Sequence, residues 1–205
     1  MPNTNRELIN KLIEDWTLKN PLIIDSFYKI RREDFILPWY KNKAYTDSPL
    51  PISGSATISQ PTTVAFMLEL LNPKKQDKVL DIWAWSGWTT ALLAKIVWNS
   101  WYVEWTEIDE NLVNFWNNNI QKYNLKNCKI SKAEKNTLWI PNKKFDKILV
   151  SASAEYIPEN LTKQLKQWWN MVIPIKEEIQ KVYKSEKNTL DIKKYYGFVF
   201  IPLQY

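Results

Sequence analysis

The stretch from Val79 to Val97 constrains the fold more than any other part of the chain. Val79-Leu80-Asp81-Ile82 is an apolar run of strand length, and Thr89–Val97 has the length and composition of a helix. Only a short turn separates the two. A buried strand that passes directly into a helix is typical of a sheet with helices packed on its faces. The chain is therefore expected to be an α/β protein.

The same alternation continues over roughly 100 residues. Phe145–Ser151 contains the continuous apolar run Ile148-Leu149-Val150, as expected of a central parallel strand. Further strands are predicted at Tyr102–Ile108, Cys128–Ser131, Met171–Ile175, Ile179–Lys184 and Phe198–Ile201, and further helices at Glu110–Tyr123 and Pro158–Lys166. No helix separates the closing strands, so they are expected to pair antiparallel. The predicted fold is a doubly wound, Rossmann-like sheet, mostly parallel, with antiparallel C-terminal strands.

The N-terminal part departs from this alternation. Asn20-Pro21 is typical of a helix start, and the apolar spacing from Leu22 to Ile30 indicates an amphipathic helix. Asp34–Ile58 is rich in Pro, Ser and Asp and is expected to form a long loop, which in a compact domain usually serves function. Pro61 then opens a helix over Thr62–Leu71.

The composition excludes several kinds of chemistry. The chain has no histidine and a single cysteine, Cys128, so His-based metal sites, Ser-His-Asp triads and thiolate metal clusters are impossible. The net charge of +6 is compatible with nucleic-acid binding, but the lysines are scattered and fit a solvated surface better. A polar N-terminus and the lack of an apolar run of about 18 residues predict neither secretion nor a membrane span.

Glycine and tryptophan occur in unusual numbers. The chain has 3 glycines and 12 tryptophans, whereas an average glycine usage of about 7% predicts roughly 14 glycines at this length. Trp83 and Trp85 fall in the turn after the first strand, and Trp168 and Trp169 stand side by side between a helix and a strand. Both places normally need glycine, because the backbone turns sharply there.

One hypothesis explains both anomalies: the source organism decodes UGA as glycine, and the sequence was translated with UGA as tryptophan. With glycine at 83 and 85, residues 79–88 read V-L-D-I-G-A-G-S-G-W, which closely resembles the first motif of class I methyltransferases. The alternative is a protein that is genuinely rich in tryptophan. Trp88 is expected to be authentic, and Trp39 is unassigned. Ten tryptophans stand where glycine is expected: Trp16, Trp83, Trp85, Trp98, Trp101, Trp105, Trp116, Trp139, Trp168 and Trp169.

Five further segments resemble protein-L-isoaspartate O-methyltransferases. Thr57-Ile58-Ser59-Gln60-Pro61 is the most specific, because it matches the active-site motif of that family. The other four are Tyr45–Ile52, Phe145–Ala152, Met171–Ile175 and Phe198–Leu203. A lone glycine-rich turn would be weak evidence, but five segments in the right order cover most of the chain.

The resemblance implies an activity, a cofactor and a domain plan. The implied reaction is methyl esterification of L-isoaspartyl carboxylates in damaged proteins, with S-adenosylmethionine as the donor. The chain is expected to be one domain, with N-terminal helices and an active-site loop in residues 1–58, a cofactor-binding core in 59–175 and closing strands in 176–205. Isoaspartyl peptides and proteins are the expected partners, and neither nucleic acid nor membrane is expected as a partner. The protein is expected to be a cytoplasmic monomer.

Ser59 is the expected catalytic residue. The resemblance implies that its hydroxyl orients the acceptor carboxylate, while Thr57 and Ile58 shape the same pocket. That carboxylate is already ionised at pH 7, so no strong general base is needed. The alternative for Ser59 is a plain helix-capping serine.

Cofactor-binding residues are expected at the carboxyl ends of the first three strands. A bare backbone at 83, 85 and 87 would let the methionine end of the donor lie against the main chain. Asp81 would orient that turn or the donor's amino group, Glu107 would accept hydrogen bonds from the ribose, and Glu134 would face the adenine. Ala133-Glu134 departs from the usual Gly-Asp of the family. The expected set is Thr57, Ile58, Asp81, Trp83, Trp85, Gly87, Glu107, Ala133 and Glu134.

Three other functions are compatible with parts of the pattern. A class I methyltransferase acting on RNA or another protein group fits the basic charge, although no added RNA-binding module is evident. A dinucleotide-dependent oxidoreductase shares the glycine turn, but gives residues 57–61 no role. A non-catalytic binding protein is expected if the tryptophans are real and fill the cofactor pocket.

Overall fold

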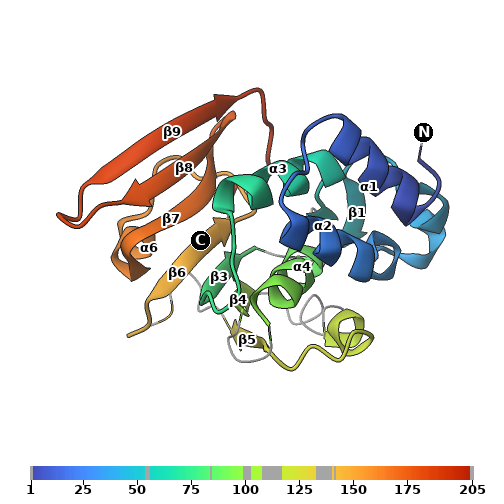
Figure 1. Ribbon diagram of the computed structural model, residues 1–205, viewed down its shortest axis with the longest axis horizontal. Helices are drawn as coiled ribbons and strands as arrows, with labels where there is room; N and C mark the ends of the chain where they lie inside the picture. The colour runs from blue at the N-terminus through green and yellow to red at the C-terminus, as the bar shows by residue number, and fades with distance from the viewer. Residues whose placement is uncertain are drawn as a thin grey trace.

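The structure, a computed structural model, describes residues 2–53, 56–83, 85–98, 103–107, 117–132, 140 and 142–203, with only the backbone for 105–107 and 129–132. Within these residues the centre is a seven-stranded sheet, β5-β4-β3-β6-β7-β8-β9 (Figure 1). The strands from β5 to β7 pair in parallel, and β8 and β9 pair antiparallel. The predicted α/β sheet is confirmed. Its strands are β3 (Val79–Ile82), β4 (Val103–Glu107), β5 (Cys128–Lys132), β6 (Phe145–Val150), β7 (Leu165–Ile175), β8 (Glu178–Lys184) and β9 (Leu190–Tyr196).

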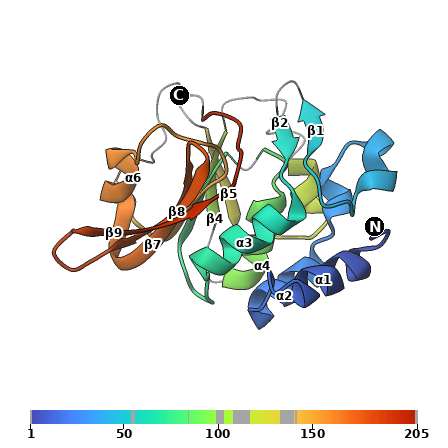
Figure 2. The ribbon, with the colours of Figure 1, turned by 90° about the horizontal axis from the view of Figure 1, so that it is seen from above.

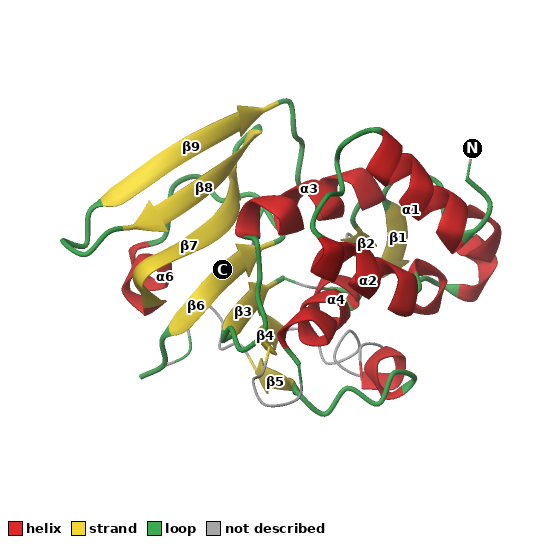
Figure 3. Cartoon of the chain, viewed as in Figure 1, coloured by secondary structure: helices red, strands yellow, loops and turns green. Residues whose placement is uncertain are grey.

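Helices cover both faces of this sheet. Figure 2 shows α1 to α4 on one side and α6 on the other. Figure 3 shows that α1 and α2 lie at the end of the molecule opposite to β8 and β9. The α-helices labelled in Figure 1 are α1 (Asn5–Glu14), α2 (Pro21–Lys29), α3 (Pro61–Leu71), α4 (Trp88–Val97) and α6 (Glu159–Gln164).

The core is built on the two central strands. Every residue of β3 and β6 is buried, because helices and neighbouring strands cover both faces. Asp146 links the start of β6 to neighbouring segments of the chain. Its carboxylate accepts a hydrogen bond from the Lys78 backbone N–H at 2.8 Å and pairs with Lys166 at 2.6 Å.

The N-terminal part contains more regular structure than the sequence predicts. The helix start at Asn20 is confirmed, since the Asn20 side chain accepts a hydrogen bond from the Leu22 N–H at 2.9 Å. The prediction of an unbroken loop over 34–58 is wrong. That stretch includes the second half of the 3₁₀-helix η1 (Arg32–Phe35), the 3₁₀-helix η2 (Pro38–Lys43) and an antiparallel hairpin of β1 (Leu50–Ser53) and β2 (Ala56–Ile58). Short 3₁₀ turns and short strands carry no long hydrophobic period, so sequence periodicity does not reveal them.

The C-terminal prediction needs one correction. Phe198–Ile201 is not a strand; it follows β9 and crosses the carboxyl edge of the sheet, where Pro202 forms an isolated bridge with Ser153. The closing strand is instead β9, which is almost wholly exposed and so lacks the apolar alternation of a half-buried strand.

Two predicted helices agree in part with the structure. The predicted helix Glu110–Tyr123 is helical at 117–121, and its first residues lie outside the described part of the chain. The predicted helix Pro158–Lys166 corresponds to α6, which ends at Gln164, and β7 begins at the next residue, Leu165. No described helix combines the length and the apolar character of a membrane span.

Candidate functional site

The predicted active-site motif, residues 57–61, lies next to the predicted cofactor turn, residues 83–87. Thr57 and Ile58 end β2, and Ser59 follows. These residues line one hollow together with Trp83, Trp85 and Ser151. The hollow lies beyond the carboxyl ends of β3 and β6, where open α/β sheets bind ligands.

Asp81 orders the turn rather than facing the open site. It is fully buried, and its carboxylate accepts hydrogen bonds from the Thr89 and Thr90 hydroxyls at 2.9 and 2.7 Å. Burial raises the pKa of Asp81 to about 7, and the two hydroxyl donors oppose that rise. Its other oxygen accepts no hydrogen bond from the described residues. This geometry ties Asp81 to the first turn of α4, and its role toward the donor stays a prediction.

Gly87 begins the helix that follows the turn. It is the N-cap of α4 with φ 78° and ψ 3°, a left-handed conformation that glycine adopts without a steric penalty. Ser86 completes the cap, because its hydroxyl accepts a hydrogen bond from the Trp88 N–H at 3.2 Å. The N-terminus of α4 therefore lies at the end of the turn.

The remaining cofactor residues lie partly outside the described chain. Glu107 is the last residue of β4, one step beyond the pair Ile82–Thr106, so its backbone stands at the same edge as the turn. Its side chain is outside the described part. Ala133 and Glu134 follow the end of β5 and are also outside the described residues.

Ser59 is not the cap of the helix that follows it. The N-cap of α3 is Gln60, which makes no side-chain capping bond. Asp47 supplies the cap instead, because its carboxylate accepts hydrogen bonds from the Thr62 N–H at 2.9 Å and the Thr62 hydroxyl at 2.7 Å. The capping alternative for Ser59 is therefore wrong. The sequence reasoning missed Asp47 as a capping residue, although it stands in the family-like segment Tyr45–Ile52.

Arg32 is a second residue that the sequence reasoning missed. Its guanidinium is buried and donates hydrogen bonds to the carbonyls of Ala44 at 2.7 Å, Ser48 at 2.8 Å and Ser59 at 3.2 Å. Burial lowers the pKa of Arg32 to about 10, against the opposing charge of Asp47, so Arg32 stays protonated at neutral pH. Arg32 thus ties the loop before β1 to the backbone of Ser59.

The indoles of Trp83 and Trp85 occupy the place of the expected donor. Their ring centroids lie 5.5 Å apart, with planes at 70°, and Trp85 is buried. The hollow that remains beside them has about 10 Å³, roughly the space of one water, whereas small-molecule sites measure about 300–1,000 Å³. The chain with tryptophan at 83 and 85 therefore does not fit S-adenosylmethionine.

A second hollow opens next to the first. It has about 180 Å³ and joins Ser59 and Ser151 to the C-terminal segment through Val199 and Ile201. Two backbone hydrogen bonds hold this segment in place, from the Ser153 N–H to the Ile201 carbonyl at 2.9 Å and from the Leu203 N–H to the Ser153 carbonyl at 2.7 Å. An acceptor group that reaches Ser59 would pass along this hollow.

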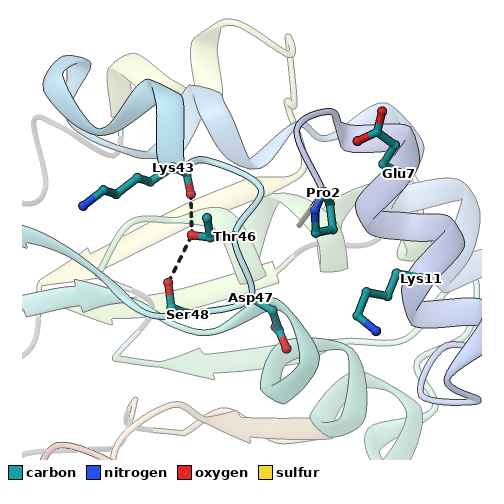
Figure 4. Close-up of a pocket in the computed structure, with 7 residues that line it drawn as sticks. All are labelled: Pro2, Glu7, Lys11, Lys43, Thr46, Asp47 and Ser48. Carbon is teal, nitrogen blue, oxygen red and sulfur yellow. Dashed lines mark hydrogen bonds between the residues drawn. The ribbon is translucent and has the colours of Figure 1, made fainter.

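A larger hollow lies away from these residues. Figure 4 shows it between α1 and the loop before β1, where Lys11 lies across from Asp47. It has about 800 Å³ but is wide open to solvent. None of its lining residues belongs to the predicted active-site motif or the cofactor turn, so its size does not identify the site.

Comparison with known proteins gives one consistent result. The family model described as "Protein-L-isoaspartate(D-aspartate) O-methyltransferase (PCMT)" matches residues 3–205. A protein-L-isoaspartate O-methyltransferase of Ignicoccus hospitalis is 33% identical over 99% of this chain and 98% of its own. That of Thermococcus onnurineus is also 33% identical, over 95% of this chain and 90% of its own.

Solved structures agree with the sequence relatives. A Plasmodium falciparum chain described as a protein-L-isoaspartate O-methyltransferase, crystallised with S-adenosyl-L-homocysteine, superposes with a TM-score of 0.86 and 26% identity over 99% of both chains. Another structure of that name has a TM-score of 0.85 at 21% identity, covering 98% of this chain and 66% of its own, and supports the fold alone. The chain belongs to the protein-L-isoaspartate(D-aspartate) O-methyltransferase family.

Proposed function

We propose that the protein, with glycine in place of Trp83 and Trp85, methylates L-isoaspartyl carboxylates of damaged proteins at the junction of residues 57–59 and the turn at 83–87. The supporting observation is that Thr57, Ser59 and Ser151 line one hollow with that turn, at the carboxyl edge of the sheet. S-adenosylmethionine, the methyl donor of this family, supplies an electrophilic methyl group on a positively charged sulfur. The oxidoreductase alternative gives residues 57–61 no role, and the family match does not favour it.

The residues of the site suit an acceptor that is already an anion. An isoaspartyl carboxylate is ionised at pH 7, so no strong general base is required, in agreement with a chain that has no histidine. The main task of the protein is then to position the acceptor oxygen. We assign this task to the Ser59 hydroxyl. Arg32 holds the backbone of Ser59 in place by a hydrogen bond to the Ser59 carbonyl.

We further propose that the donor binds at the carboxyl ends of the first three strands of the sheet, against the turn at 83–87. Asp81 holds the first turn of α4 in place, and Gly87 permits the backbone to bend into that helix. Glu107, at the end of β4, would accept hydrogen bonds from the ribose hydroxyls. Ala133 and Glu134 would lie near the adenine, with Glu134 as the acceptor for its amino group.

A double variant tests the activity. Trp83→Gly with Trp85→Gly removes the indoles from the donor position, and we expect this protein to methylate an isoaspartyl peptide. A peptide of the same sequence with a normal aspartyl residue is the control and should stay unmodified. Equal labelling of both peptides, or of neither, would contradict the proposed function.

A single substitution tests the role of Ser59. In the double variant, Ser59→Ala should lower kcat for the isoaspartyl peptide about 10- to 100-fold, the effect of losing one hydrogen bond to a charged group. The affinity for S-adenosylhomocysteine should change little. Ser185→Ala is the matched control, because Ser185 lies exposed in the β8–β9 hairpin and bonds to Thr189. A tenfold weaker affinity with unchanged kcat in Ser59→Ala would reassign Ser59 to donor binding.

We further propose a cytoplasmic monomer that acts on peptides and proteins, with neither nucleic acid nor membrane as a partner. The scattered lysines support this proposal, because they form no block of like charge. Light scattering measures the molar mass in solution and should give that of a monomer. Excess RNA should not change the rate at which an isoaspartyl peptide is methylated. Strong inhibition by RNA would speak against it.

A further inference from the structure

Five tryptophans adopt a backbone conformation that normally requires glycine. Their φ angles are 58° at Trp16, 64° at Trp83, 29° at Trp85, 70° at Trp98 and 68° at Trp168. Only a few per cent of residues other than glycine have positive φ, and for a bulky side chain it is an outlier. The backbone is described at nine tryptophans, so this rate predicts fewer than one such residue.

Trp16 occupies the glycine position of a helix-ending motif. After the C-cap Asp15, the Trp16 N–H bonds to the Ile13 carbonyl and the Thr17 N–H to the Leu12 carbonyl, both at 3.0 Å. This pair of bonds defines the Schellman motif, whose left-handed residue is usually glycine. The Trp16 side chain is 75% exposed, so little packing offsets the conformational strain.

Trp98 and Trp168 repeat this combination of strain and exposure. Trp98, the C-cap of α4, has φ 70° and ψ 170°, a region that essentially only glycine occupies. Its side chain is 60% exposed, and that of Trp168 is 57% exposed. Trp168 lies where the pairing of β7 with β6 shifts register, and glycine often marks such irregularities in strands.

Trp83 and Trp85 add a functional conflict to the strain. Both stand in the turn after β3, and both rings point into the hollow that Thr57 and Ser59 line. The same turn would have to bring a bare backbone against the donor. Tryptophan at these positions is therefore unfavourable for the local fold and for ligand binding.

Trp88 shows what an authentic tryptophan looks like in this chain. It lies in α4, is 1% exposed and packs edge-on against Phe27 at a centroid distance of 5.4 Å. Its indole N–H donates a hydrogen bond to the Ile30 carbonyl at 3.4 Å. A buried indole with a packed ring and a satisfied N–H is the usual state of tryptophan in a core.

We propose that residues 16, 83, 85, 98 and 168 are glycine in the native protein, encoded by UGA codons that the source organism reads as glycine, whereas Trp88 is encoded by UGG. The backbone angles carry this inference independently of the numbers of glycine and tryptophan in the chain. Its functional consequence rests on the proposed function. Without the two indoles, the hollows beside Ser59 join into a site for a sulfonium nucleoside that contacts the main chain at 83–87.

The codons and the native protein provide the first test. We expect UGA at the five positions and UGG at residue 88. Peptide mass spectrometry of protein purified from its source should then give peptides lighter by one indolylmethyl group, replaced by hydrogen, for each of the five positions. UGG codons or full-mass peptides at these positions would overturn the proposal.

Recombinant variants provide a test that separates folding from function. Trp16→Gly, Trp98→Gly and Trp168→Gly together should raise the melting temperature on the order of 10 °C through relief of left-handed strain, without creating affinity for S-adenosylhomocysteine. Trp83→Gly with Trp85→Gly should create that affinity, measured by calorimetry. Trp88→Gly is the matched control and should lower the melting temperature, because it empties a packed core position.

The outcomes of this test are distinct. A lower melting temperature in the triple variant, or equal ligand affinity with and without the indoles at 83 and 85, would overturn the glycine proposal. A protein with all five replacements that is more stable and binds S-adenosylhomocysteine, but does not methylate an isoaspartyl peptide, would instead refute the proposed function. We refer to this protein as the five-glycine form.

Discussion

At the scale of single residues, Asp81 connects the sheet to the cofactor turn. It is a fully buried carboxyl group, and one of its oxygens accepts hydrogen bonds from two threonine hydroxyls at the start of α4. Burial is the largest influence on Asp81 and raises its pKa to about 7, against the two threonine hydroxyls. The protonation of Asp81 is therefore linked to the stability of the turn.

Asp81→Asn in the five-glycine form should change how stability depends on pH. In the unfolded chain the Asp pKa is about 3.9, so the folded state holds the proton more tightly and loses stability as the pH rises from about 4 to 7. Between pH 5 and pH 7 this loss is roughly 2–3 kcal/mol. Urea unfolding at both pH values should show it in the parent but not in Asp81→Asn. The same slope in both proteins would exclude Asp81 as its source.

At the scale of elements, the segment from β2 to α3 depends on two contacts from distant parts of the N-terminal region. Arg32 binds the carbonyls that flank the hairpin, and Asp47 caps α3. Neither Arg32 nor Asp47 itself lines the hollow beside the cofactor turn. Both hold the backbone that presents Ser59.

Arg32→Lys should destabilise the protein strongly. A lysine ammonium cannot reach the carbonyls of Ala44, Ser48 and Ser59 together, and each buried acceptor left without a partner costs about 1–3 kcal/mol. We expect a loss of roughly 3 kcal/mol in the free energy of unfolding, measured with urea. Arg31→Lys is the control, because Arg31 is exposed, and should stay within about 0.5 kcal/mol. Similar losses in both variants would show that the carbonyl contacts are unimportant.

Asp47→Asn should weaken the start of α3 and the presentation of Ser59. The new amide loses one acceptor for the Thr62 hydroxyl or the Gln60 amide, both of which now bind the carboxylate, and helix caps contribute about 1 kcal/mol. In the five-glycine form, Asp47→Asn should raise KM for the isoaspartyl peptide and leave the affinity for S-adenosylhomocysteine unchanged. Asp191→Asn on the exposed β9 is the control. Loss of donor affinity in Asp47→Asn would contradict a role confined to the acceptor side.

At the scale of the whole molecule, the site is assembled from segments far apart in the chain. The C-terminal segment reaches the carboxyl edge of the sheet and places Val199 on the wall of the hollow that contains Ser59. Val199 is 90% exposed. A charge introduced at Val199 would therefore face an incoming peptide without disturbing the core.

In the five-glycine form, Val199→Glu and Val199→Lys should change KM for the isoaspartyl peptide in opposite directions. A carboxylate at this position repels the acceptor carboxylate and should raise KM for the isoaspartyl peptide about two- to fivefold, whereas an ammonium should lower it by a similar factor. Both effects should shrink in high salt, since exposed charges are screened. Equal shifts in the same direction would show that the hollow does not admit the acceptor.

Much of the fold follows from local patterns. The continuous apolar runs of β3 and β6 predict buried parallel strands, and both are buried along their full length. The prediction of a strand at Phe198–Ile201 is wrong, because an apolar run that crosses the edge of a sheet has the same sequence pattern as a strand inside it. The strand β9 was missed because an exposed edge strand buries too little surface to leave a period in its sequence.

The parallel strands and the conflict between tryptophan and the turn at 83–87 can be predicted from the amino-acid sequence, because each depends on residues close together in the chain, and the family follows from motifs that occur in the right order. The left-handed backbone positions, the place of Asp47 rather than Ser59 in the cap of α3, and the positions of Arg32 and Val199 beside Ser59 become evident in the folded chain. These features depend on contacts between residues distant in sequence, and a pattern with a short period contains no information about such contacts.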